Sequence, residues 1–147
     1  KSPTQRTMEV LRRDGWTVDV VERFVRNPKH PAGGFRKDFL GLIDIIAVKP
    51  GERVLFVQVT DATSRSKHLN KMRESEHLAV LIAVGRVLLW CWRRPTKTIR
   101  CYRGEPEELT ADDVIRLPVA RMAVRTPANR EQHELFAGER KREVGGV

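Results

Sequence analysis

Residues 43–60, IDIIAVKPGERVLFVQVT, decide the fold of this chain because they contain two strands and the turn that joins them. The apolar runs at about 40–48 and 53–60 have strand character, and Lys49-Pro50-Gly51-Glu52 between them has the composition of a tight turn. The stretch therefore predicts a β-hairpin. It also poses a question, because an acid interrupts the first run and an amide the second.

The segments around this hairpin alternate between helix and strand patterns. Helices are expected at 4–14 and 64–76, and strands at about 16–25, 78–85, 87–94 and 98–103. Residues 26–39 contain two prolines, two glycines and four Lys or Arg, which predicts a mobile basic loop. Strands on both sides of a helix predict an α/β fold, with a mixed sheet of about five strands flanked by helices.

The length of 147 residues indicates one α/β domain, expected over residues 1–120, with a short helix and a basic tail over 121–147. Thr110 and Asp113 predict the capped start of a short helix that Pro118 ends, and residues 129–136 predict another. The final residues, ERKREVGGV, have nothing to bury and are expected to be disordered.

The positive charge is concentrated in the first half of the chain. Residues 1–73 carry 15 Lys and Arg against 8 Asp and Glu, a net charge of +7 out of a formal total of +9. Clustered positive charge indicates a partner rich in phosphates, because each neutralised phosphate releases condensed counterions. The alternative is a basic surface that only keeps the protein soluble. No apolar run approaches the ~20 residues that a bilayer requires, so no membrane association is expected.

The cysteines and histidines have no metal-ligand spacing. Cys91 and Cys101 also lack the pattern of a disulfide framework, so reduced, buried thiols in a cytoplasmic protein are expected. A hairpin of 87–94 with 98–103 would place the two thiols opposite each other. Trp90 and Trp92 share one face of their strand, where packing under a helix is expected in preference to a stacking platform for bases.

Asp44 needs an explanation, because an ionised carboxylate is costly to bury unless it is paired or holds a metal. Gln58 and Thr60 alternate with Phe56 on one face of the second strand, and the hairpin can bring that face beside Asp44. With the carbonyl oxygen of Val59, these side chains would form a set of oxygen ligands suited to Mg²⁺. The alternative is an Asp that only caps a turn or pairs with an Arg.

The order of elements resembles the PD-(D/E)-x-K nuclease superfamily over about residues 4–94, and its layout is closest to the archaeal Holliday junction resolvases and the restriction-endonuclease-like fold. That family has an Asp before a hydrophobic strand and a Glu-x-Lys triplet some dozen residues later. Asp44 matches the Asp, and Gln58-Val59-Thr60 stands in the place of the triplet. The resemblance implies a Mg²⁺- or Mn²⁺-dependent endonuclease that acts as a homodimer on branched or otherwise structured DNA.

Two departures from the family pattern weaken the predicted site. Gln58 replaces a metal-binding acid and Thr60 replaces the lysine, so metal binding and catalysis are expected to be reduced or lost. The candidates for the missing carboxylate and the missing cation are Glu22, Asp38, Lys67 and Lys71.

Three functions therefore remain open. The first is a metal-dependent DNA endonuclease or resolvase-like enzyme, the second a DNA-binding module with the same fold and no chemistry, and the third a basic interaction domain that never meets DNA. For the enzyme, the catalytic residues would be Asp44, Gln58, Thr60 and Lys67, and the metal ligands Asp44, Gln58, Val59, Glu22 and Asp38. The expected phosphate contacts are Lys29, Arg36, Lys37, Arg65, Lys67 and Lys71.

Overall fold

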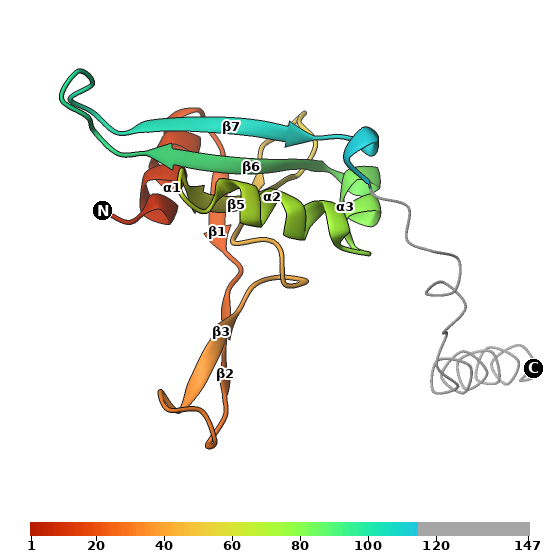
Figure 1. Cartoon of the computed structure of the whole chain (residues 1–147). Coiled ribbons are helices and arrows are strands. Elements are labelled where there is room, and N and C mark those ends of the chain that lie inside the picture. The colour runs from red at the N-terminus through yellow and green to blue at the C-terminus, as the bar shows by residue number, and fades with distance from the viewer. Residues whose placement is uncertain (115–147) are drawn as a thin grey trace, which may run out of the picture. The chain divides into compact units, whose positions relative to one another are not determined.

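The computed structural model describes residues 1–114, which form an α/β fold around a mixed sheet of five strands (Figure 1). The predicted α/β fold with a mixed sheet flanked by helices is confirmed. The helices are α1 (Pro3–Arg13), α2 (Arg65–Glu74) and α3 (Leu78–Val84), and the strands are β1 (Thr17–Val20), β2 (Arg23–Arg26), β3 (Gly34–Lys37), β4 (Ile45–Val48), β5 (Leu55–Asp61), β6 (Arg86–Arg93) and β7 (Arg103–Leu109). The predicted helix at 129–136 and the basic tail lie outside the described residues.

The predicted hairpin is confirmed as β4 and β5, which pair antiparallel with Ile45 opposite Val57. The Glu52 N–H donates to the Lys49 carbonyl at 3.1 Å, and Gly51 takes a positive φ of 80° that a glycine adopts without strain. The sheet order is β1-β4-β5-β6-β7, so β5 has a neighbour on both sides and its residues 55–60 are all buried. The acid and the amide of this stretch therefore lie at the centre of the fold.

Helices cover both faces of the sheet. Because β5 and β6 run parallel, the chain must cross over between them, and α2 and α3 make this crossover (Figure 1). Alternate residues of β6 point to opposite faces. Trp90 and Trp92 pack with Leu11 of α1, so the predicted packing of the tryptophans under a helix is confirmed. The residues that pack on the α2–α3 side include Ile43, Phe56, Leu69, Met72, Leu78, Leu81, Val87 and Leu89.

The predicted strand at 78–85 is wrong, because this segment is α3. Its sequence, LAVLIAV, is apolar throughout, and a short apolar run does not distinguish a buried strand from a buried helix. The burial in the structure follows a helix, since Leu78 and Leu81 are buried while Val80 and Val84 are exposed. The need for a crossover between parallel strands decides the outcome.

Truncations in α3 should report this helical pattern. Leu81 is 3% exposed and Val80 is 61% exposed. We therefore expect Leu81→Ala to lower the free energy of unfolding by about 2–4 kcal/mol, the range for a buried large-to-small change. Val80→Ala should change it by less than about 0.5 kcal/mol. Urea unfolding measures both, and equal losses at the two positions would contradict the orientation of the helix.

The predicted strand at 98–103 is also wrong, because the last strand among the described residues is β7, which begins only at Arg103. β7 is an edge strand with the charged sequence RGEPEEL, and its acids pair with arginines of β6: Arg86 with Glu108 and Arg93 with Glu105, each at 2.9 Å. Strand propensity alone does not identify such a segment. Cys91 lies opposite Glu105, and Cys101 is exposed, so the two thiols do not face each other and only Cys91 is buried as expected.

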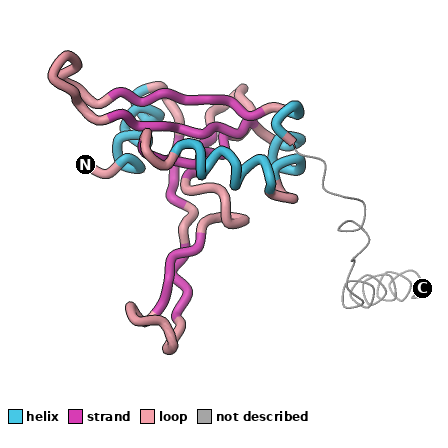
Figure 2. The backbone as a smooth tube through the Cα atoms, viewed as in Figure 1, coloured by secondary structure: helices cyan, strands magenta, loops and turns pink. Residues whose placement is uncertain are grey.

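The predicted strand at 16–25 is two strands, and part of the predicted basic loop at 26–39 is strand, because Arg26 ends β2 and Gly34–Lys37 form β3. β2 and β3 pair antiparallel as a separate two-stranded sheet, the β2–β3 arm, which extends away from the main sheet (Figures 1 and 2). The Phe24 ring lies over Gly34, where a Cβ would approach it to 2.5 Å. The same Cβ would lie 2.4 Å from the Val25 carbonyl oxygen, so the two contacts explain why a glycine is needed at this buried position.

The short helix predicted after residue 109 is present only as η1, the 3₁₀ turn Ala111–Asp113. Thr110 is its N-cap as predicted, and the Asp113 side chain accepts from the Thr110 N–H at 2.9 Å. The part of the prediction that continues to Pro118 lies outside the described residues.

Candidate functional site

Asp44 lies immediately before β4, and its backbone is held on both sides. Its N–H donates to the Val57 carbonyl at 3.0 Å, and its carbonyl accepts from the Val21 N–H at 2.9 Å. The carboxylate reaches β5, where Oδ2 accepts from Gln58 Nε2 at 2.6 Å and from the Val59 N–H at 2.8 Å. The structure thus brings together Asp44, Gln58 and Val59 as predicted. It also gives Asp44 two hydrogen-bond donors from β5, neither of which is the Arg of the alternative prediction.

The environment of Asp44 disfavours its charged form. Burial raises its pKa from the ordinary value of 3.8 to about 6, the Val59 N–H opposes this rise, and the nearby acids Asp38 and Glu22 add to it. Lys71 lowers the pKa. Three of the predicted substitutes, Asp38, Glu22 and Lys71, therefore lie close enough to Asp44 to influence its charge. An acid whose pKa is shifted by burial and by specific neighbours is typical of functional sites.

Gln58 supplies the second polar group of the site. Its side chain is 2% exposed, and among the described residues its Oε1 has no hydrogen-bond partner. A buried amide oxygen without a partner is costly, which indicates that something outside this part of the chain satisfies it. The terminal torsion of Gln is broad and roughly two-fold, so the amide can turn and direct Oε1 at Asp44. Two acceptors that face each other need a proton or a cation between them.

This donor set fits a hydrated Mg²⁺. That ion commonly keeps several waters and takes one or two carboxylates plus substrate oxygens, and Asp44 with Gln58 offers one carboxylate and one amide oxygen. An all-protein cage does not fit, because residues 1–114 contain no group of three or more His, Cys, Asp or Glu placed to hold a metal. Glu22 forms an ion pair with Arg36 at 3.1 Å, and the Val59 carbonyl accepts from Gln58 Nε2 at 3.3 Å, so both have other partners.

Thr60, which stands where the resembled nuclease superfamily has its lysine, carries no charge. Thr60 is buried, and its hydroxyl donates to the Asp61 carbonyl at 3.3 Å. Phe56, Gln58 and Thr60 occupy every second position of β5 and therefore share one face of the strand. The Phe56 ring packs on the α2–α3 side, so the side chains of Gln58 and Thr60 also face α2. Lys67 and Lys71 of that helix are exposed, and neither forms an ion pair with an acid of residues 1–114.

His68 is a site residue that the sequence analysis missed. Its Nδ1 is buried without a hydrogen-bond partner in the described part of the chain. Burial lowers the pKa of His68, and Lys71 and Lys67 lower it further, so the neutral imidazole is favoured. Asp38 and Lys71 influence both His68 and Asp44. The spacing of His68 from the other histidines gave no sign of a site. The signal that could have identified it is its position between Lys67 and Lys71, on the helix that follows the strand with the polar residues.

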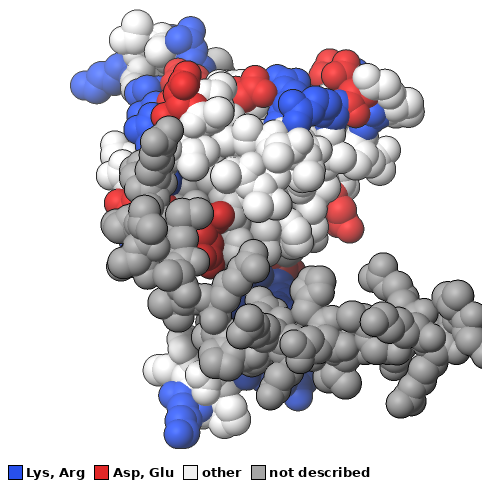
Figure 3. Space-filling view, turned by 90° about the vertical axis from the view of Figure 1, so that its right-hand side faces the viewer, with Lys and Arg blue, Asp and Glu red and all other residues white. Residues whose placement is uncertain are grey.

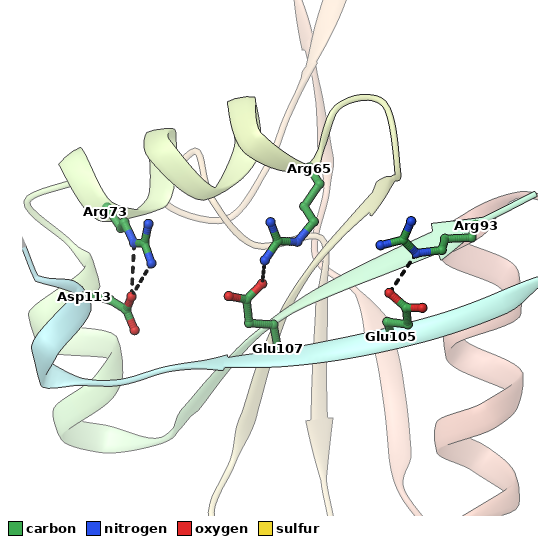
Figure 4. Close-up of polar contacts among 6 residues, drawn as sticks. All are labelled: Arg65, Arg73, Arg93, Glu105, Glu107 and Asp113. Carbon is green, nitrogen blue, oxygen red and sulfur yellow. Dashed lines mark hydrogen bonds and ion pairs between the residues drawn. The ribbon is translucent and has the colours of Figure 1, made fainter.

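The other predicted phosphate contacts divide into paired and unpaired cations. Figure 4 shows Arg65 and Arg73 of α2 turned toward acids near the sheet edge: Arg65 pairs with Glu107, and Arg73 Nη2 pairs with Asp113 Oδ1 at 2.8 Å. Arg65 is thus largely neutralised within the protein.

The β2–β3 arm carries Lys29 in its turn and Lys37 on β3. Figure 3 shows that the visible charged side chains at the far end of the arm are Lys and Arg. At the opposite end of the molecule, side chains of both signs are visible.

The protonation of Asp44 predicts a pH-dependent cost of folding. The folded state binds the proton more tightly, with a pKa of about 6 against 3.8, so Asp44 makes folding less favourable as the pH rises through this window. Asp44→Asn cannot ionise, and we expect it to be more stable than the wild type by roughly 1–2 kcal/mol at pH 7.5, with no gain at pH 4. Urea unfolding at the two pH values measures this. A gain of the same size at both would contradict a buried charge at this position.

No protein-family model, curated protein or solved structure matches this chain. Among the described residues, the structure contains no helix that is both long and apolar enough to cross a membrane.

Proposed function

We propose that this chain binds branched or otherwise structured DNA and cleaves it as a divalent-metal-dependent endonuclease centred on Asp44. The observation that carries the proposal is the Asp44–Gln58 pair, in which the buried Gln58 Oε1 has no hydrogen-bond partner within residues 1–114 and the half-buried Asp44 has a raised pKa. The resemblance to the PD-(D/E)-x-K superfamily supports it. So do the exposed cations Lys67 and Lys71 of α2 and Lys29 and Lys37 of the arm, which form no ion pair within residues 1–114 and offer contacts to phosphates.

In this proposal, the residues around Asp44 would have different roles in phosphodiester hydrolysis. A bound Mg²⁺ supplies a Lewis acid and lowers the pKa of a coordinated water. Asp44 would hold the ion, and Gln58 would contribute its amide oxygen after turning. Lys71 already favours the ionised form of Asp44, and with Lys67 it would hold the phosphate group against the site. His68, with a lowered pKa, would be a neutral group able to accept a proton.

Metal binding at Asp44 tests the enzyme directly. Titration of the full chain with Mn²⁺ at pH 7.5 by calorimetry should show one binding event that Asp44→Asn removes. The same titration of Asp112→Asn, an exposed acid on η1, should match the wild type. Identical Mn²⁺ binding in all three proteins would contradict a site at Asp44.

A specific observation favours the second candidate, a DNA-binding module without chemistry. Oδ2 of Asp44 already accepts two hydrogen bonds, and Thr60 offers no charge to stabilise a transition state. For this function, DNA binding should be retained while no DNA structure is cleaved with Mg²⁺ or Mn²⁺. The homodimer that the family resemblance implies remains a prediction, and sedimentation of the full chain measures it.

A further inference from the structure

A pocket of about 430 Å³ lies where the β2–β3 arm joins the main sheet. Its volume is within the range of roughly 300–1,000 Å³ that is typical of small-molecule sites. Apolar and charged side chains share its wall, namely Val21, Phe39 and Leu40 with Arg23, Lys37 and Asp38. A pocket that combines an apolar wall with a few charged groups indicates a ligand that has both characters.

The pocket carries two cations and one acid, Asp38, and neither cation forms an ion pair with an acid of residues 1–114. Arg23 and Lys37 lie directly opposite each other in the antiparallel pairing of the arm, so their side chains share one face. Like charges in this arrangement repel each other, and neither residue forms an ion pair within residues 1–114. On the other face of the arm, Arg36 does pair with Glu22. Two facing cations without a partner indicate an anionic ligand such as a phosphate.

The apolar side of the pocket includes a residue with a strained backbone, Leu40. Leu40 has a φ of 54°, in the left-handed region that side chains other than glycine rarely adopt, and it is still 40% exposed. Phe39 is 39% exposed, and its ring stacks on the buried Phe56 with an interplanar angle of 8°. Leu40 lies in the tight turn between the bridged residues Phe39 and Ile43, and strained residues of this kind cluster at binding and active sites.

We propose that this pocket receives one unpaired nucleotide of a DNA strand. Arg23 and Lys37 would bind its phosphate, Phe39 and Leu40 would contact the face of its base, and Asp38 would accept a hydrogen bond from an exocyclic amino group. A base stacked inside a duplex cannot offer its face, so the nucleotide must be unpaired. Phe39 of the pocket forms a β-bridge with Ile43, the residue before Asp44, which places the pocket beside the candidate site. The inference rests on the proposed DNA binding and names the feature of the DNA that is recognised.

The test compares two DNAs that differ by one unpaired nucleotide, with binding to the full chain measured by fluorescence anisotropy without metal. The wild type should bind a duplex with a single-nucleotide bulge about tenfold more tightly than the fully paired duplex, the scale of one base stacking on apolar side chains. The double variant Arg23→Gln/Lys37→Gln should lose most of this preference. Leu40→Gly, which relieves the strained φ, should lose it as well while the melting temperature is unchanged or higher.

A charge-matched control separates the pocket from the general charge of the arm. Arg26→Gln/Lys29→Gln removes two cations of the arm that do not line the pocket, so it should weaken both DNAs equally and keep their ratio. A ratio near one in the wild type, with both DNAs bound, would overturn the pocket and leave the proposed DNA binding intact. Failure to bind either DNA would overturn the DNA binding itself. Binding of free deoxynucleoside monophosphate without any preference for the bulge would assign the pocket to a small molecule.

Discussion

Asp44→Asn is expected to reduce Mg²⁺- or Mn²⁺-dependent cleavage of a four-way DNA junction by about 10³-fold, the upper range for removing one group that stabilises developing charge. Asparagine keeps the shape of the side chain, and its amide oxygen can still accept from the Val59 N–H, so the hairpin stays closed. Alanine is a poorer choice, because it would leave two buried donors without partners. Cleavage of labelled junctions on denaturing gels measures the rate.

Introducing the Glu-x-Lys triplet of the resembled nuclease superfamily should raise the rate of cleavage. Gln58→Glu with Thr60→Lys adds a carboxylate beside Asp44 and an ammonium on the face toward α2, and we expect cleavage to rise by about 10²-fold. Without metal the same variant should be less stable than the wild type above pH 6, because Gln58 Nε2 and Asp44 Oδ2 are only 2.6 Å apart and two carboxylates would repel each other. Mn²⁺ should restore its melting temperature.

The two variants also separate the candidate functions. Cleavage that persists in Asp44→Asn would indicate another site or a contaminating nuclease. Cleavage that appears only in the restored double variant would show that the fold can hold the chemistry and that the natural chain is a binding module. A restored variant that folds normally, binds no Mn²⁺ and cleaves nothing would contradict the resemblance to the nuclease superfamily.

The second large effect concerns DNA affinity and its dependence on salt. Lys67 and Lys71 of α2 are exposed and form no ion pair with any acid in the described part of the chain, so each is expected to contact one phosphate. Each phosphate neutralised on duplex DNA contributes about −0.9 to the slope of log affinity against log salt, so Lys67→Ala/Lys71→Ala should make this slope shallower by about 2. The affinity at low salt should fall by at least about tenfold, largely without regard to sequence. Anisotropy titrations between 50 and 300 mM salt, roughly the range over which such slopes are measured, give both values.

The same helix offers a control with an equal change of net charge. Arg65 and Arg73 are already paired with Glu107 and Asp113, so their replacement by alanine removes two cations that are neutralised within the protein (Figure 4). We expect the salt slope of this double variant to stay within about half a unit of the wild type. If both double variants shift the slope equally, only net charge matters and α2 is not the DNA-binding face.

Local chemistry in the sequence was sufficient for the central hairpin and for two of the helices. The Lys49–Glu52 turn between two apolar runs led to β4 and β5, and the helices expected at 4–14 and 64–76 are α1 and α2 within one or two residues at each end. The apolar run at 78–85 was ambiguous, since helix and strand bury such a segment equally well. Its conformation was decided by the parallel pairing of β5 with β6, which requires a crossover that no local pattern encodes.

The candidate site, too, was predictable from the sequence in part and depended on the tertiary structure for the rest. The sequence by itself determined that an acid and an amide sit on facing strands, because strand periodicity and a short turn fix which side chains come together. Only the tertiary structure decided that Gln58 and the Val59 N–H both donate to Asp44, that Glu22 is taken by Arg36, and that His68 lies near the same charges. It also decided that residues 23–37 form an arm with a pocket at its base. These features depend on distances between segments far apart in the chain, and such distances are set by how the helices and the arm pack against the sheet.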